Sequence, residues 1–117
     1  MPLRKMVERL TKPTDELDRE QLTQYCDVRR LAPLDQLVAR QPVRVGGEIR
    51  SVRIVPRAGA PALEVTVSDG RGSLVAVFLG RRKIAGMSPG RKVALEGVVA
   101  DNGVRATITN PVYELLS

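Results

Sequence analysis

From residue 42 onward, apolar and polar residues alternate along the chain, and this two-residue period limits the possible folds more than any other feature. In residues 43–50, valine, glycine and isoleucine alternate with arginine, glycine and glutamate, and the pattern resumes after a phase slip at Ser51. Successive side chains of a strand point to opposite faces, so the pattern predicts a half-buried β-strand. The Gly46-Gly47 pair within this strand predicts a bend or a bulge.

Turn-forming residues divide the alternating region into short strands. Asp69-Gly70 and Asn102-Gly103 supply the positive φ angles that tight hairpin turns require. Between the third and fourth strands, the basic segment 80–87 is expected to form one helical turn. The expected strands cover residues 43–54, 63–68, 73–79, 92–100 and 104–109, with a loop at 56–61 and an apolar tail at 112–116. Five short strands with such turns predict a small all-β barrel or sandwich.

Before residue 42 the apolar residues follow a helical spacing instead. Two segments each place them on one face of a helix: Leu3, Met6, Val7 and Leu10 in the first, and Leu22, Tyr25 and Cys26 in the second. The second helix is expected to run from Thr14 to about Arg29, where the cations Arg29 and Arg30 complement the negative end of the helix dipole. The first helix is too short to be stable alone, so we expect it to pack on apolar surface of the β-domain or of a partner subunit. Residues 1–41 are thus expected to form a helical extension, and residues 42–117 the β-domain.

The rarest residue types exclude several classes of protein. The sequence contains one cysteine, Cys26, and no histidine, so it cannot form an internal disulfide, a Ser–His pair or an ordinary zinc site. We therefore expect a protein with no enzymatic activity, no metal and no cofactor. No apolar run approaches the roughly 20 residues that span a bilayer, and the basic N-terminus lacks the apolar core of a secretory signal. The chain is accordingly expected to be cytoplasmic and to have no membrane partner.

Several short motifs in residues 43–116 occur in an order known from one fold. They are the opening Val43-x-Val45-x-Gly47, the Asp-Gly-x-Gly turn at 69–72, Pro89-Gly90, Glu96-Gly97-Val98 and Asn110-Pro111. This order resembles the OB-fold domains of the anticodon-binding and RecG-helicase-wedge type, and the whole chain is similar to small stand-alone OB-fold proteins of high-GC bacteria. The resemblance implies a five-stranded OB-fold barrel, preceded by short N-terminal α-helices, that binds oligonucleotides across its second and third strands.

Positive charge is concentrated in the β-domain. Residues 42–117 hold 11 Lys/Arg and 6 Asp/Glu, whereas residues 1–41 hold 8 and 7. A basic domain predicts an anionic partner, most often nucleic acid. The nucleic-acid-binding residues expected from the clustered cations and the one phenylalanine are Arg50, Arg53, Arg57, Arg71, Phe78, Arg81, Arg82, Lys83 and Arg105. Their phosphate contacts predict low-specificity binding of single-stranded or structured DNA or RNA.

The strand at 73–79 leaves two questions open because it is apolar on both faces. One face carries Leu74, Ala76 and Phe78, and the other carries Val75, Val77 and Leu79. Phe78 is therefore either a core residue or a platform on which a base stacks. The second face needs a cover from the N-terminal helices, the tail at 112–116 or another subunit. If it is exposed, the alternative function is a protein-interaction or oligomerisation module. Glu64, which points outward from the neighbouring strand, is expected to repel phosphate.

Overall fold

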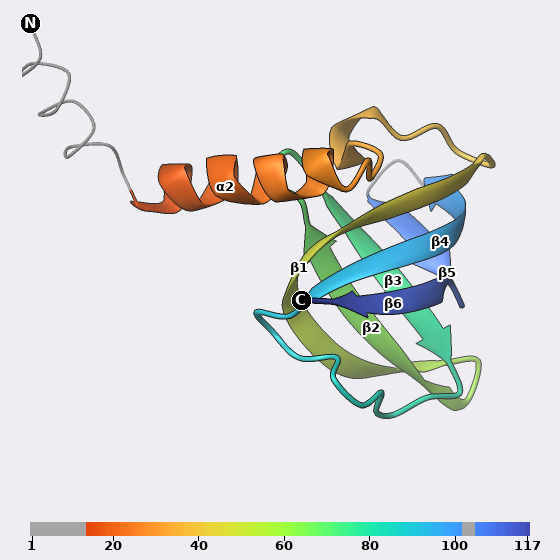
Figure 1. Ribbon diagram of the computed structural model, residues 1–117. Coiled ribbons are helices and arrows are strands. Elements are labelled where there is room, and N and C mark those ends of the chain that lie inside the picture. Colours follow the sequence, from red (N-terminus) through yellow and green to blue (C-terminus); the bar gives the residue numbers. More distant parts are fainter. Residues whose placement is uncertain (1–13, 102–104) are drawn as a thin grey trace, which may run out of the picture.

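The alternating region forms strands, and the segment beginning at Thr14 forms a helix (Figure 1). The computed structural model describes residues 14–101 and 105–117. Its elements are α2 (Thr14–Val28), the 3-10 turn η1 (Leu34–Gln36), β1 (Pro42–Arg57), β2 (Ala60–Ser68), β3 (Ser73–Leu79), β4 (Lys92–Asp101), β5 (Ala106–Thr109) and β6 (Val112–Leu116). The expected first helix, with Leu3, Met6, Val7 and Leu10, lies outside the described residues. The expected second helix is confirmed.

Five of the strands close into a ring. The sheet order is β1-β2-β3-β5-β4-β6, and β1 also pairs with β4, which closes β1, β2, β3, β5 and β4 on themselves. The neighbours are antiparallel except β3 and β5, whose short parallel seam joins residues 75–77 to residues 107–109. The expected all-β architecture is confirmed, but the strand count was wrong. The apolar tail is not a loose segment, because it forms β6 and pairs with β4.

Alternate side chains from all five ring strands fill the interior. The buried set includes Val45, Ile49, Leu63, Val65, Val67, Leu74, Ala76, Phe78, Val93, Leu95, Val99 and Ile108. Ile84 and Met87, from the segment between β3 and β4, pack on the same cluster. The expected helical turn at 80–87 is absent, since the described residues between β3 and β4 form turns and irregular loop. Two apolar anchors hold this segment without a helix.

Phe78 belongs to the core and not to the binding surface, which corrects one of its two expected roles. Its ring is buried and meets the Tyr113 ring edge to face, with 5.9 Å between the centroids. A ring inside the core cannot stack on a base at the surface.

Replacing Phe78 by leucine should therefore reduce stability without weakening the expected binding of nucleic acid. We expect the free energy of unfolding to fall by about 1–2 kcal/mol, because apolar contacts and the aromatic pair are lost. Chemical denaturation measures this change. A parallel titration with an oligonucleotide checks the affinity, and weaker binding at unchanged stability would restore the stacking role.

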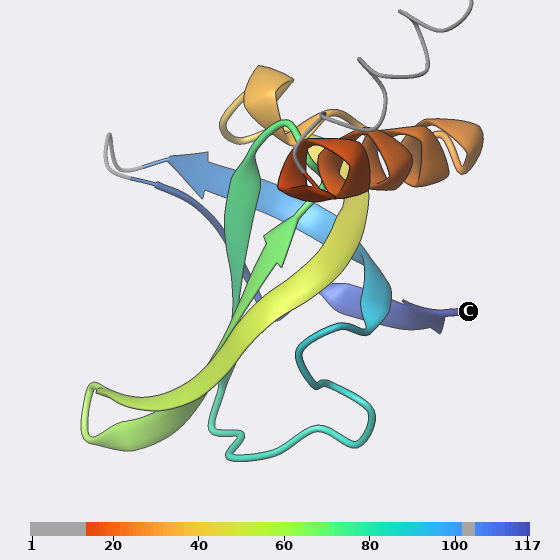
Figure 2. The ribbon, with the colours of Figure 1, turned by 90° about the vertical axis from the view of Figure 1, so that its left-hand side faces the viewer.

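The first strand changes neighbours along its length, as Figure 2 shows for the long, curved β1. Residues 42–48 pair with β4, and residues 48–57 pair with β2. The register slips between Ile49 and Ser51, which confirms the phase slip in the sequence. The expected loop at 56–61 is much shorter than predicted: Ala58 and Gly59, with φ of 51° and 80°, form a two-residue turn between β1 and β2.

Helix α2 lies across one end of the ring. Leu22 and Cys26 pack with Leu31 and with Ala94 of β4. Thr23 Oγ1 donates a hydrogen bond of 3.1 Å to the Asp69 carbonyl, which ties the helix to the turn between β2 and β3. The expected apolar face of the helix is confirmed. Because α2 lies at the end of the ring, it leaves the outward sides of the strands uncovered.

The end of α2 also confirms one expectation. Arg29 donates to the Tyr25 carbonyl at 3.2 Å, and its guanidinium lies over the Tyr25 ring, 3.5 Å from the centroid. Arg30 has a φ of 58°, a left-handed conformation that ends the helix. The arginines at this position thus serve the helix C-terminus.

Candidate functional site

Three of the expected binding arginines gather around one carboxylate. They come from separate places, Arg53 and Arg57 from β1 and Arg105 from the residue before β5. Glu64 of β2 accepts hydrogen bonds from Arg57 at 2.8 Å, Arg53 at 3.2 Å and Arg105 at 3.5 Å. We call Arg53, Arg57 and Arg105 the arginine cluster. It lies on the side of β1, β2, β3 and β5 that points away from the core, here called the outer face.

Strand pairing explains why these side chains meet. Arg53 is directly opposite Glu64 in the β1–β2 ladder, and Val77 is opposite Glu64 in the β2–β3 ladder. Cross-strand neighbours share one face of a sheet, so the carboxylate lies between a cation and an apolar residue. The arginines were predicted from the sequence, but their common partner was not. Glu64 does not stand exposed to repel phosphate, because its side chain is only 5% exposed.

The cluster keeps an excess of positive charge. The hydrogen bond from Arg57 is the main cause that lowers the pKa of Glu64, and Arg53 and Arg105 lower it further. Glu64 is therefore ionised at neutral pH. Three guanidinium groups surround one carboxylate, and the arginine side chains remain 63%, 43% and 40% exposed. Arg53 and Arg57 share this one carboxylate, so the outer face keeps a net positive charge at this point.

The second apolar face of β3 is buried within the chain itself. Val75 and Val77 are 5% and 2% exposed, and they pack with Ala62 and Val55 on the outer face. Since β3 lies between β5 and β2, the side chain of Arg105 must cross outside β3 to reach Glu64. This crossing places an arginine over the strand. The sequence had instead predicted a cover by the N-terminal helices, by the tail at 112–116 or by another subunit.

A second basic region lies at the α2 end of the outer face. Arg50, Arg71 and Arg19 border a hollow of about 270 Å³ beside the turn between β2 and β3. Arg50 bonds Glu48 at 3.0 Å. Arg71 makes two bonds with Asp27 of α2, at 2.7 and 2.9 Å, which lower the pKa of that carboxyl. Arg50 and Arg71 are thus partly neutralised by nearby acids.

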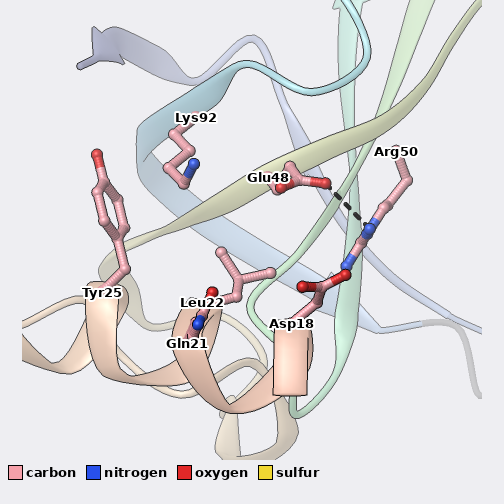
Figure 3. A pocket seen from close by; sticks show the side chains of 7 residues that line it. All are labelled: Asp18, Gln21, Leu22, Tyr25, Glu48, Arg50 and Lys92. Carbon is pink, nitrogen blue, oxygen red and sulfur yellow. Dashed lines mark hydrogen bonds and ion pairs between the residues drawn. The ribbon is translucent and has the colours of Figure 1, made fainter. Parts of the chain in front are cut away.

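Figure 3 shows an adjoining hollow of about 440 Å³ between α2 and the strands β1 and β4. Its lining side chains are Asp18, Gln21, Leu22, Tyr25, Glu48, Arg50 and Lys92. Lys92 points into the hollow, with its ammonium 5.1 Å from the centroid of the Tyr25 ring. Two acids and two bases line it, so this hollow lacks the net positive charge of the arginine cluster.

Three further cations lie at the opposite end of the outer face. Arg81, Arg82 and Lys83 are exposed and follow directly after β3. The Gly80 amide donates to the Pro61 carbonyl at 2.8 Å, so this segment starts beside the hairpin of β1 and β2. Among residues 14–101 and 105–117, no ion pair of these three cations is found. They add positive charge near the end of the sheet at which Arg57 lies.

The thiol of Cys26, the one cysteine in the sequence, is a further group whose reactivity bears on function. Cys26 is buried, and burial is the main cause that raises its thiol pKa to about 11. The thiol is therefore protonated and unreactive at neutral pH. In the described part of the chain, no group of three or more cysteine, aspartate or glutamate side chains is placed to hold a metal ion. No helix among these residues has both the length and the apolar character needed to cross a bilayer.

Comparison with known proteins adds no family assignment. No protein-family model matches this chain, and no curated protein sequence is significantly similar to it. The outer face therefore supplies the main indication of function.

Proposed function

We propose that this chain is a non-enzymatic OB-fold module that binds the phosphate backbone of nucleic acid on its outer face. The arginine cluster is the observation that carries the proposal. The ring order β1-β2-β3-β5-β4, closed by pairing of β4 with β1, supports the OB-fold assignment. In OB-folds, strands two and three and the loops after strands one and four contact oligonucleotides. Arg57 and Arg105 stand next to these two loops.

Phosphate is the ligand group that suits this surface best. Arginine presents several N–H donors in a planar fork that matches phosphate oxygens, and its charge persists at any relevant pH. The outer face has no exposed aromatic ring among its described residues, because Phe78 points inward. Binding through phosphates without stacking or base-edge contacts gives affinity with little sequence preference.

The basic surface is long enough for a short single strand. The β1–β2 ladder runs from Ser68 to Ala60 along the outer face. At roughly 3.3 Å per residue, these eight steps span about 26 Å. Arg50 and Arg71 lie near one end, Arg53 lies in the middle opposite Glu64, and Arg57 lies at the other end, near the start of the segment that carries the three cations 81–83. Single-strand-binding OB-folds commonly contact about four or more nucleotides.

The alternative function, protein interaction through the outer face of β3, has weaker support. That reading needs an exposed apolar patch, and Val75 and Val77 are buried within the chain. Leu79 is the one outer-face residue of β3 that remains exposed and apolar. A single exposed leucine is ordinary for a protein surface.

Salt-dependent binding tests the proposal. Labelled single-stranded and duplex DNA and RNA are titrated with the parent, with R53Q/R57Q and with R81A/R82A/K83A at two salt concentrations. The parent should bind, and on single strands log K should fall by about 0.7 per phosphate contact against log salt. The double variant should show a shallower slope by about 1.4, and the triple variant by up to about 2, for all sequences alike.

A matched control separates local contacts from total charge. Arg44 bonds Glu96 and Glu114 where β1 pairs with β4, at the other end of β1 from Arg53 and Arg57, so R44Q removes a cation without touching the arginine cluster. This variant should bind like the parent. If the parent binds no oligonucleotide at low salt, the proposed function is wrong. If R44Q weakens binding as much as one arginine of the cluster, the assigned surface is wrong.

A further inference from the structure

We propose that Glu64 is a positioning residue, whose buried carboxylate holds Arg53 and Arg57 in a preformed site for a phosphate oxyanion. The inference rests on the proposed function, because it concerns the same outer face. It reverses the expectation from the sequence, in which an outward-pointing acid opposes phosphate binding. The structure assigns the acid a part in building the site.

The depth of the side chains supports this role. Glu64 is almost fully buried, whereas the arginines around it are about half exposed. The carboxylate therefore lies beneath the guanidinium groups, and a ligand arriving from solvent meets the arginines first. Glu64 is held on both of its oxygens, with Oε1 accepting from Arg53 and Arg105 and Oε2 accepting from Arg57. No buried side-chain polar atom in the described residues lacks a partner.

The hydrogen bonds leave donors for a ligand. Arg57 uses only Nη2 toward Glu64, and Arg53 uses Nε and Nη2. A guanidinium has five N–H donors, so neither fork is exhausted by the carboxylate. The unused donors of the two side chains belong to one patch, because both arginines come from β1 and point to the same face. A phosphate can take these donors without displacing Glu64.

Holding the arginines in place favours binding. A free arginine side chain samples many rotamers, and ordering it on binding reduces affinity. Three neighbouring guanidinium groups also repel one another, which a central carboxylate offsets. Without Glu64, the forks would separate and would have to be ordered by the ligand. The carboxylate thus lowers the positive charge of the site by one, but it fixes the arrangement of the arginine N–H donors.

Charge counting makes the opposite prediction, so the two explanations can be separated. Glu64→Gln raises the net charge by one and removes the acid nearest the site. If only charge mattered, this variant would bind oligonucleotides more tightly. If Glu64 positions the arginines, the variant binds about tenfold more weakly because their order is lost. The sign of the change decides.

The experiment compares three variants of the full chain. The probe is a fluorescein-labelled oligothymidylate of about 12 nucleotides, a length within the range of OB-fold sites. E64Q tests the carboxylate. E64D keeps the charge but shortens the reach, and it should weaken binding by about threefold. E96Q removes an acid of β4 that pairs with Arg44 away from the arginine cluster, and it raises the net charge equally. Its affinity should stay within about twofold of the parent.

Side-chain NMR supplies a readout that does not depend on affinity. The Arg53 Nε–H group donates to Glu64, so its signal should be that of an ordered group in the parent. In E64Q this signal should show motional averaging while the backbone amide spectrum stays folded. If E64Q does not fold, E64D is used for both measurements.

The outcomes distinguish this inference from the proposed function. Weaker binding by both E64Q and E64D, with a mobile Arg53 side chain and unchanged binding by E96Q, supports positioning. Tighter binding by E64Q, or equal binding by E64D and the parent, overturns it while leaving the proposed function intact. Absence of binding by the parent overturns the proposed function, and with it the positioning role.

Discussion

Replacing Asp69 by alanine is expected to lower the free energy of unfolding by about 3 kcal/mol or more. The carboxylate is 1% exposed, and it accepts hydrogen bonds from three backbone amides: Leu34 at 2.9 Å, Arg71 at 2.9 Å and Gly72 at 3.0 Å. Alanine would leave these donors without their partner. The buried Leu34 amide alone would cost about 1–3 kcal/mol, and loss of the two part-buried bonds in the turn adds to it. The bond to Leu34 also ties η1 to the turn between β2 and β3.

Denaturant unfolding measures this effect, and two variants sharpen it. Asp69→Asn keeps an oxygen for Arg71 and Gly72 but places an amide group where Leu34 donates, so its loss should be smaller than that of alanine. Asp27→Ala removes an exposed partner of Arg71 and should change the midpoint little. An Asp69→Ala midpoint equal to that of the parent would show that these hydrogen bonds are dispensable.

Replacing Gly47 by alanine should be comparably severe, with a loss of about 3 kcal/mol or failure to fold. Gly47 lies where β1 leaves β4 and begins to pair with β2. A Cβ atom there would lie 2.6 Å from the Ser68 carbonyl carbon and 3.1 Å from the Asp69 Cα. Both obstacles are backbone atoms, so no side-chain rotation relieves the overlap. The crossing of the two strands requires a residue without a side chain.

A second glycine provides the matched control. Gly59, in the turn between β1 and β2, has a φ of 80°, and a Cβ added there would meet nothing within 4 Å. Gly59→Ala therefore tests conformational strain alone, with an expected loss of about 1 kcal/mol. Thermal unfolding of both variants gives the comparison. Equal losses of stability in the two variants would mean that steric overlap at Gly47 adds no cost beyond the conformational strain.

The strands could be predicted because their signals are local. Alternation, Asp-Gly turns and a phase slip at Ser51 depend on neighbouring residues, and the structure confirms strands at each expected place. Strand β6 was not predicted because residues 112–116 lack a clear alternating pattern. They also follow Asn110-Pro111, a pair that predicts the end of a strand. Their pairing with β4 is a tertiary contact that no local pattern specifies.

The candidate site was predictable only in part. The arginines were identified by charge, but charge along the sequence does not show which cations share a face. Arg53 and Glu64 are paired by the β1–β2 register, and Arg105 reaches them from just before the start of β5, which is distant in sequence. The same limit applies to Phe78, whose inward direction depends on which face of β3 meets the core. Arg19 was not singled out because its helix was read as an extension without a binding role.

The ring of strands should open more easily at the parallel seam between β3 and β5 than at the β1–β2 pairing. It has three residue pairs, against nine between β1 and β2, although the Asn110 side chain adds a bond to the Leu79 amide. Amides of residues 107–109 should accordingly exchange with solvent through smaller fluctuations than those of β2. Arg105 lies on one side of this seam, and Arg53 and Arg57 lie on the other. An anion bound by arginines on both sides would link β5 to β1 and oppose this opening. The amides of β5 should then exchange more slowly in the bound protein than in the free protein.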